Sequence, residues 1–160
     1  MEYQIRRMRP DETPLLESFL YEAIFQRAGE PRLPREVVLE PALRVYIEDF
    51  GEGEDDYCLV AQEGDAVMGA VWVRNIEGYG SVDGDTPEFA ISVLPAYRGR
   101  GIGTALMRAM LAHLKESGTA RASLAVQKDN YALRMYRSVG FRVVSENEQE
   151  YIMVHDLKKL

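Results

Sequence analysis

Residues 93–106 read Val93-Leu94-Pro95-Ala96-Tyr97-Arg98-Gly99-Arg100-Gly101-Ile102-Gly103-Thr104-Ala105-Leu106. A proline ends an apolar strand, a glycine-rich turn follows, and apolar residues then recur at helical spacing. The first N–H groups of a helix lack intrahelical partners and carry the positive end of the helix dipole. Glycines let the backbone approach a ligand closely, and Arg98 and Arg100 add positive charge. The stretch therefore predicts a strand–turn–helix unit that binds an anion, with a diphosphate as the expected ligand.

This loop differs from the two most common phosphate-binding loops. No lysine follows Gly103, although the Walker A sequence requires one, and this disfavours a domain that binds ATP through the loop. Thr104 stands where the dinucleotide-binding sequence has its third glycine. A tight turn with solvent-facing arginines and no ligand is the structural alternative.

The segments around this loop predict an α/β (α+β) protein. Downstream, periodicity predicts helix 103–115, strand 121–126, helix 131–139 and strands 142–145 and 151–157, the last two as an antiparallel hairpin. Upstream, it predicts strands 3–9, 57–62, 66–74 and 87–94, a helix that ends at about residue 28, and a second helix over 35–50. Strands that alternate with helices indicate one sheet covered by helices.

Composition excludes several classes of protein. The 160 residues fit a single domain over 1–160, and 46% hydrophobic residues are enough to form a core. Nineteen Lys and Arg against 26 Asp and Glu give a net charge of −7, which argues against a nucleic-acid partner. One cysteine, Cys58, and two isolated histidines, His113 and His155, predict neither disulfides nor a metal site. The chain shows no apolar signal core and no apolar run of about 18 residues, so we expect no membrane partner and a cytoplasmic location.

Two motifs resemble the GNAT superfamily of N-acetyltransferases. Residues 98–103, Arg98-Gly99-Arg100-Gly101-Ile102-Gly103, are similar to its Arg/Gln-x-x-Gly-x-Gly/Ala loop. Residues 130–141, Asn130-Tyr131-Ala132-Leu133-Arg134-Met135-Tyr136-Arg137-Ser138-Val139-Gly140-Phe141, resemble its second motif, with Met135 in place of the usual leucine. The two motifs lie about 30 residues apart in the expected order of elements, and the resemblance covers roughly residues 87–141.

The resemblance implies a GNAT-like central mixed, mostly antiparallel sheet flanked by helices, in which strands four and five splay apart. Acetyl-CoA would bind in that notch as co-substrate. Its pantetheine arm would run along the backbone of the fourth strand. The implied cofactor-binding residues are Ile91, Ser92 and Val93 on that strand, Arg98, Gly99, Arg100, Gly101, Gly103 and Thr104 around the diphosphate, and Asn130 beside the pantetheine.

Tyr136 is the candidate general acid, since the resemblance implies that it faces the sulfur. A phenol with a pKa near ~10 is protonated at neutral pH and can donate a proton to a thiolate leaving group. The alternative is core packing, because Ala132, Met135, Tyr136 and Val139 fall on one helical stripe.

Glu88 is the candidate general base, directly or through water. Amine acetylation needs a neutral amine, and an ammonium group with a pKa near ~10.4 must first lose a proton. Ser92 lies on the same strand face and could relay a proton. A solvated or structural role for Glu88 stays open, and Asn130 can equally cap the following helix.

The acidic segment 48–56 has two interpretations. It is either solvated surface or a region that attracts a cationic substrate, and Asp83 and Asp85 could add charge near the site.

The sequence therefore predicts an N-acetyltransferase that moves an acetyl group from acetyl-CoA to a primary amine by direct attack. The amine is expected to be cationic and to belong to a small molecule or a protein N-terminus. A CoA-binding sensor of the same fold without turnover is the alternative. The acceptor, the acyl chain preference and the oligomeric state stay open, with a homodimer among the options.

Overall fold

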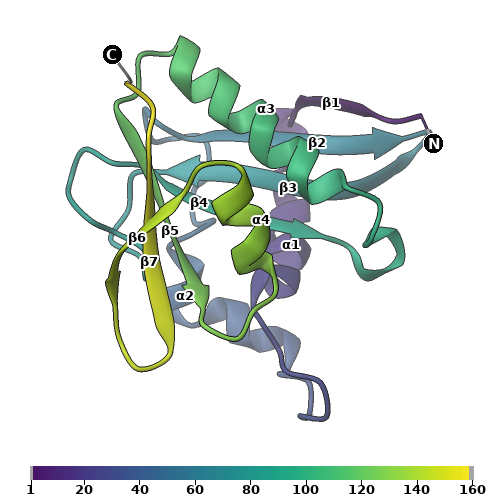
Figure 1. Ribbon diagram of the computed structural model, residues 1–160. Coiled ribbons are helices and arrows are strands. Elements are labelled where there is room, and N and C mark those ends of the chain that lie inside the picture. The colour runs from purple at the N-terminus through teal and green to yellow at the C-terminus, as the bar shows by residue number, and fades with distance from the viewer. Residues whose placement is uncertain (1, 159–160) are drawn as a thin grey trace.

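The computed structural model describes residues 2–158 and shows a seven-stranded sheet with helices on both faces (Figure 1). The order across the sheet is β1-β2-β3-β4-β5-β7-β6, and every neighbouring pair is antiparallel except β4 and β5. This confirms the expected α/β (α+β) class with a mixed, mostly antiparallel sheet. The strands are β1 (Gln4–Arg7), β2 (Tyr57–Glu63), β3 (Ala66–Arg74), β4 (Glu88–Val93), β5 (Arg121–Gln127), β6 (Arg142–Glu146) and β7 (Glu150–Asp156).

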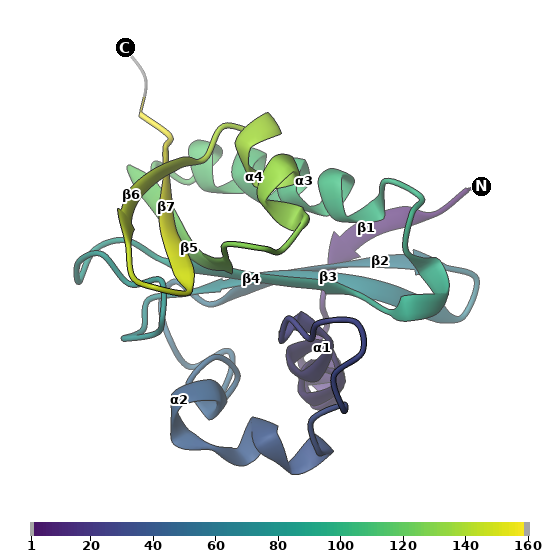
Figure 2. The same cartoon turned by 60° about the horizontal axis from the view of Figure 1, so that its bottom comes forward.

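The helices cover the two faces of the sheet in sequence order. The N-terminal helices α1 (Leu16–Ala23) and α2 (Pro41–Arg44) lie on one face, and α3 (Ile102–Glu116) and α4 (Ala132–Ser138) lie on the other (Figure 2). Short 3-10 helices precede α1, α2 and α3 and span η1 (Pro10–Leu15), η2 (Arg35–Leu39) and η3 (Pro95–Tyr97).

The parallel strands β4 and β5 separate soon after they meet. Their register contains one pair of residues, Glu88 opposite Ser123, and the Ser123 N–H donates to the Pro87 carbonyl at 3.0 Å. In contrast, β3 and β4 pair along the whole of β4, from Arg74–Glu88 to Gly69–Val93. The β4 edge that faces β5 is therefore open beyond Glu88, as the resemblance implied.

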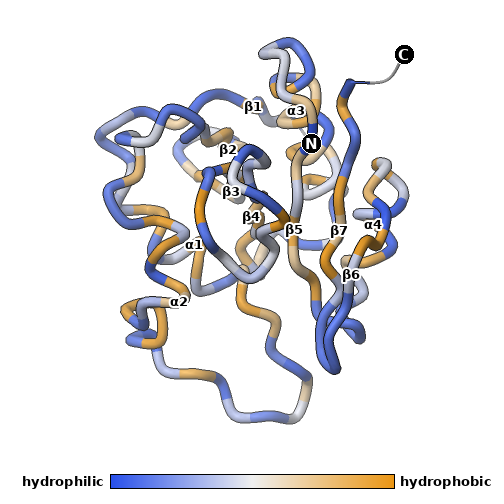
Figure 3. Tube along the Cα trace, turned by 90° about the vertical axis from the view of Figure 1, so that its left-hand side faces the viewer, coloured by the Kyte–Doolittle hydropathy of each residue, from blue (hydrophilic) through white to orange (hydrophobic). Residues whose placement is uncertain are grey.

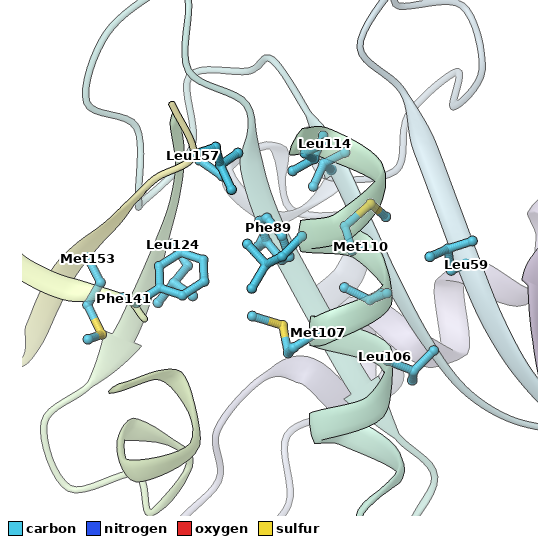
Figure 4. Packing of buried hydrophobic residues seen from close by; sticks show 14 of the residues in the cluster. Leu59, Phe89, Leu106, Met107, Met110, Leu114, Leu124, Phe141, Met153 and Leu157 are labelled. Atoms are coloured by element: carbon cyan, nitrogen blue, oxygen red, sulfur yellow. The ribbon is translucent and has the colours of Figure 1, made fainter. Parts of the chain in front are cut away.

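Helix α3 packs its apolar face against the sheet. Leu106, Met107 and Met110 are fully buried there, where α3 contacts β2, β3 and β4 (Figure 4). A second cluster fills the space between the sheet and α1, where Trp72 is also fully buried. The apolar stretches lie within the strands and packed helices, while the β6–β7 turn is hydrophilic (Figure 3).

The first two helices are shorter than their sequence patterns predict. Helix α1 ends at Ala23 and not near residue 28, because Ile24 adopts an extended conformation. The continuous helix predicted over 35–50 is wrong. Glu40 is extended before Pro41, since a proline disfavours helical geometry in the preceding residue, so the segment divides into η2, α2 and turns.

Candidate active site

A cleft with two adjoining cavities lies where β4 and β5 diverge. We call the first, of about 370 Å³, the glutamate cavity because Glu88 lines it. We call the second, of about 460 Å³, the glycine-loop cavity because the loop of residues 98–104 lines it. The two cavities adjoin, since both are lined by Ala23, Ile24, Phe25, Ile91, Asn130 and Tyr136.

The glycine loop has the open backbone surface that its sequence predicts. Gly99 and Gly101 both have φ of +80°, a conformation that other residues rarely adopt. A Cβ atom added at either position would meet no atom within 4 Å, so the space beside the backbone is open. Gly101 immediately precedes α3, and the first-turn amides of that helix offer donors and positive dipole charge to an anion.

Most of the predicted cofactor-binding residues come together at the glycine-loop cavity. Arg100 does not line it, and its guanidinium lies over the Tyr97 ring at 5.6 Å from the ring centre. The predicted residues that line this cavity are Ile91, Ser92, Val93, Arg98, Gly99, Gly101, Gly103, Thr104 and Asn130.

The Arg98 side chain braces the loop. Its Nε donates to the Val93 carbonyl at 2.8 Å, and its Nη2 lies 3.2 Å from the Glu22 carboxylate. Much of the charge of Arg98 is therefore offset by Glu22, and the backbone amides are left as the main anion-binding groups.

Ser92 has a structural partner on α1. Its buried hydroxyl donates to the Phe19 carbonyl at 2.7 Å, which ties β4 to α1. Ser92 and Glu88 share a strand face, yet four residues of strand separate their backbones by about 13 Å. Because its proton is held by Phe19, we leave Ser92 out of a proton relay with Glu88.

Asn130 caps the start of α4 and also faces both cavities. Its Oδ1 accepts a hydrogen bond from the Ala132 N–H at 2.9 Å. The capping geometry is thus present, and within residues 2–158 the Asn130 side-chain amide donates to no protein group. That amide remains available to a ligand in the cleft.

Tyr136 lies at the junction of the two cavities. Its ring packs edge-on against Phe141, with 6.3 Å between the ring centres, so the side chain has a packing role as well. Burial raises the pKa of the Tyr136 phenol to about 12, which keeps it protonated at neutral pH. No hydrogen bond joins its hydroxyl to another residue of the described chain.

Glu88 is almost completely buried, with 2% of its surface exposed, at the end of the glutamate cavity. Burial raises the pKa of Glu88 to about 6, although hydrogen bonds from Tyr46, Gly80 and Ser81 favour its ionised form. The Tyr46 hydroxyl and the Gly80 N–H, the latter at 3.0 Å, both donate to Oε2. The side chain is therefore fixed, and at pH 7 it is mostly ionised and able to accept a proton.

Sequence analysis missed the groups that hold Glu88. Tyr46 belongs to the segment predicted as a helix over 35–50, and Gly80 lies between the strands predicted over 66–74 and 87–94. In the structure a Cβ at Gly80 would lie 2.6 Å from the Ala125 nitrogen, and one at Gly78 would lie 2.6 Å from a Glu88 oxygen. The Gly78-Tyr79-Gly80 sequence is the signal of this close approach.

Two of the acidic residues considered for substrate attraction are paired with arginines. Asp56 is buried and accepts two hydrogen bonds from Arg74, both at 3.0 Å. Asp83 forms an ion pair with Arg121. The remaining acidic residues from Glu48 to Asp55 are exposed on the surface.

The cleft combines three chemical functions along one path. Backbone amides at one end suit a phosphate group, a protonated phenol lies in the middle, and a carboxylate with a pKa near neutrality lies at the other end. This arrangement suits proton transfer to and from a reacting group held between Tyr136 and Glu88. No helix within residues 2–158 is long and apolar enough to cross a membrane.

The sequence also matches known acetyltransferases. The chain is 29% identical over 154 residues to the mycothiol acetyltransferase of Thermobispora bispora, which covers 85% of this chain and 52% of that protein. It is 31% identical over 110 residues to the mycothiol acetyltransferase of Nocardiopsis dassonvillei, with 66% of this chain and 33% of that protein covered. The chain thus spans about a third to a half of the length of these curated relatives.

Solved structures share the fold over nearly the whole chain. The ribosomal-protein-S18-alanine N-acetyltransferase of Escherichia coli superposes with a TM-score of 0.68 at 19% identity, covering 99% of this chain and 96% of that chain. The PaiA N-acetyltransferase of Thermoplasma acidophilum, in complex with coenzyme A, superposes with a TM-score of 0.69 at 18% identity, covering 98% and 99%. The sequence model of the Acetyltransferase (GNAT) family matches residues 19–141, and the chain therefore belongs to this family.

Proposed function

We propose that this protein transfers the acetyl group of acetyl-CoA to a primary amine by direct attack of the amine on the thioester. The observation that carries the proposal is the pair of adjoining cavities, one lined by the glycine loop and the other by a buried carboxylate. Ile91, Asn130 and Tyr136 line both cavities and so mark the point where the acyl group and the amine would meet.

The glycine-loop cavity fits acetyl-CoA. The open space beside Gly99 and Gly101 and the first-turn amides of α3 suit its diphosphate. The unpaired edge of β4 at Ile91 and Val93 offers backbone groups to the pantetheine amides. The Asn130 amide is a further donor to the same arm. When bound, acetyl-CoA supplies an activated acyl carbon and a thiolate leaving group.

Glu88 and Tyr136 would divide the proton transfers between them. Glu88, directly or through water, takes one proton from the incoming ammonium group, and the neutral amine attacks the acyl carbon. A C–N bond forms and the C–S bond breaks. Tyr136 gives its proton to the departing thiolate, and the second proton lost by the nitrogen restores the phenol.

The acceptor itself is proposed only as a class. Relatives bear the names of a mycothiol acetyltransferase and, in Haemophilus influenzae, a ribosomal protein bS18-alanine N-acetyltransferase, the latter 35% identical over 63 residues (39% of this chain and 43% of that protein). These names support an amine acceptor, and the net charge of −7 favours a cationic one. A single domain over residues 1–160, a cytoplasmic location and a homodimer stay predictions.

Release of the CoA thiol tests the proposal. We expect thiol release from acetyl-CoA only when an amine from a mixed panel is added, with a mass increase of one acetyl group on that amine. Calorimetry of CoA binding in parallel separates binding from turnover. Tight CoA binding without thiol release for any amine would contradict the transferase and leave a CoA-binding sensor.

A further inference from the structure

The glutamate cavity carries negative charge without positive charge. Its lining contains two carboxylates, Glu88 and Glu150, and within the described chain no lysine, arginine or histidine lines it. The other polar groups are the amides of Gln127, Gln149 and Asn130 and three tyrosine hydroxyls. A cavity with this lining attracts cations and repels anions along its whole length.

Glu150 lines this cavity from the other side of β5. It begins β7 and lies opposite Gln127 of β5, four residues along β5 from the position that pairs with Glu88. Glu150 is partly buried, and its charge is close enough to raise the pKa of Glu88. The two carboxylates therefore belong to one electrostatic site.

Glu150 has no cationic partner within residues 2–158. Lys128 follows β5, and its N–H donates to the carbonyl of Gln149 beside Glu150, but its side chain pairs with Glu146 at 2.6 Å. Arg27 donates to Gln127 at 3.3 Å, and its guanidinium is held by both oxygens of Asp129, at 2.6 and 2.8 Å. Burial raises the pKa of Glu150, while a hydrogen bond from Asn147 favours its charged form.

Glu88 and Glu150 differ in the partners that stabilise their negative charge. Glu88 accepts hydrogen bonds from Tyr46 and Gly80 and has a fixed position. Glu150 is partly removed from water without a compensating cation, an arrangement that costs stability unless a ligand supplies the charge. Apolar side chains, including Phe25, Leu43 and Ala90, also line the cavity and provide a wall suited to a methylene chain.

We propose that Glu150 is a specificity-determining residue that binds a second positive charge on the acceptor, so that the preferred substrates are diamines and other primary amines with a second cationic group. This inference rests on the proposed acetyl transfer. One amino group reaches the junction at Tyr136 and reacts, while the second cation pairs with Glu150 in the glutamate cavity.

The test compares matched amines. Thiol release is measured with α,ω-diamines from propane-1,3-diamine to heptane-1,7-diamine and with n-alkylamines of the same lengths. For the wild type we expect kcat/KM of the best diamine to exceed that of its alkylamine by about tenfold or more, because a charge-assisted contact in a partly buried site is strong. Glu150→Gln should bring this ratio close to one, because the diamine then loses its second charged contact. Glu148→Gln, which removes an exposed charge from the same hairpin, should keep the ratio.

A charge reversal gives a second readout. Glu150→Lys should lose the diamine preference and favour ω-amino acids such as 6-aminohexanoate, whose carboxylate can pair with the new lysine. The role of Glu150 would be overturned if Glu150→Gln kept the wild-type ratio of diamine to alkylamine kcat/KM, or if that ratio were close to one in the wild type. In either case the proposed acetyl transfer would stand. No thiol release with any amine would instead refute the proposed function itself.

Discussion

The two ends of the cleft are built from different parts of the polypeptide. At the glycine loop, Gly99 and Gly101 line the cavity with open space beside their backbone. At the opposite end, the reactive group is the Glu88 side chain, which Tyr46 and the backbone of Gly80 hold in place from separate segments. The loop should therefore tolerate most side-chain changes apart from those at its glycines, whereas the glutamate end should depend on single side chains.

Replacement of Glu88 should give the largest loss of turnover. Glu88→Gln keeps the size of the side chain and removes the proton acceptor, so we expect the acceptor kcat/KM at pH 7 to fall by about 10²- to 10⁴-fold. Acetyl-CoA binding, at the other end of the cleft, should change little. Steady-state kinetics and calorimetry on the same preparations measure both quantities, with Glu148→Gln as the control.

The pH profile identifies the cause of that loss. The ionised carboxylate is the active form, and its pKa is raised to about 6, so the wild-type rate should fall as the pH drops below about 6. The pH–rate profile of Glu88→Gln should lack this fall, and its rate should follow the neutral fraction of the amine. The difference in rate between the variant and the wild type should therefore become smaller toward pH 9. If Glu88→Gln had the same rates as the wild type at every pH, Glu88 would not be the general base.

Tyr136→Phe tests the junction between the two ends. The ring keeps its packing against Phe141 and only the hydroxyl is lost. If the phenol protonates the thiolate, kcat should fall by about 10- to 1,000-fold while acetyl-CoA affinity stays close to that of the wild type. Tyr131→Phe, which alters an exposed tyrosine that lines only the glycine-loop cavity, is the matched control. Wild-type turnover in Tyr136→Phe would leave Tyr136 with packing alone.

At the glycine loop, a side chain at Gly101 should weaken binding more than chemistry. Gly101→Val should lower acetyl-CoA affinity by about tenfold or more, because the side chain occupies the open space and strains a residue at φ +80°. Gly64→Val carries a similar strain at φ +57° in the β2–β3 turn, with open space around it, and should lower stability without changing affinity. Calorimetry of acetyl-CoA binding with both folded variants distinguishes the effect of backbone strain from the effect of a side chain that contacts acetyl-CoA. Equal affinity in Gly101→Val and the wild type would exclude this loop from the cofactor site.

The same contrast explains what the sequence could predict. Features built from the backbone can be predicted from short stretches of sequence. The strand–loop–helix unit was correctly predicted from the glycines at 99, 101 and 103. The splayed strands were correctly predicted from the family resemblance of this loop and the Asn130–Phe141 motif. Features that depend on contacts between distant segments are harder to predict, because no short stretch of sequence contains both partners. The Tyr46 hydroxyl meets Glu88 across 42 residues of sequence, and helical periodicity describes only the apolar side of Tyr46. Likewise, Pro41 divided a helix that apolar spacing alone would have continued.

Glu150 shows a further limit of the sequence. A glutamate at the start of a strand is indistinguishable from a solvated one until the sheet order brings β7 beside β5. Only then does it face the same cavity as Glu88. The long-range register, and not the local pattern, gives this residue its surroundings.

Tyr46→Phe should produce the smallest effect and the most specific one. The Tyr46 hydroxyl donates to Glu88 and favours its ionised form, so its removal should raise the pKa of Glu88 above its value of about 6. Because the ionised form is active, the acid limb of the pH–rate profile should move to higher pH, while turnover above pH 8 stays near the wild-type level. Near pH 6 the rate should fall several-fold, since each unit of pKa changes the ionised fraction below it by about tenfold. Tyr79→Phe, which changes another tyrosine of the glutamate cavity, should leave the limb in place. A limb that moves to lower pH, or that does not move, would show that Tyr46 fills space beside Glu88 without setting its ionisation.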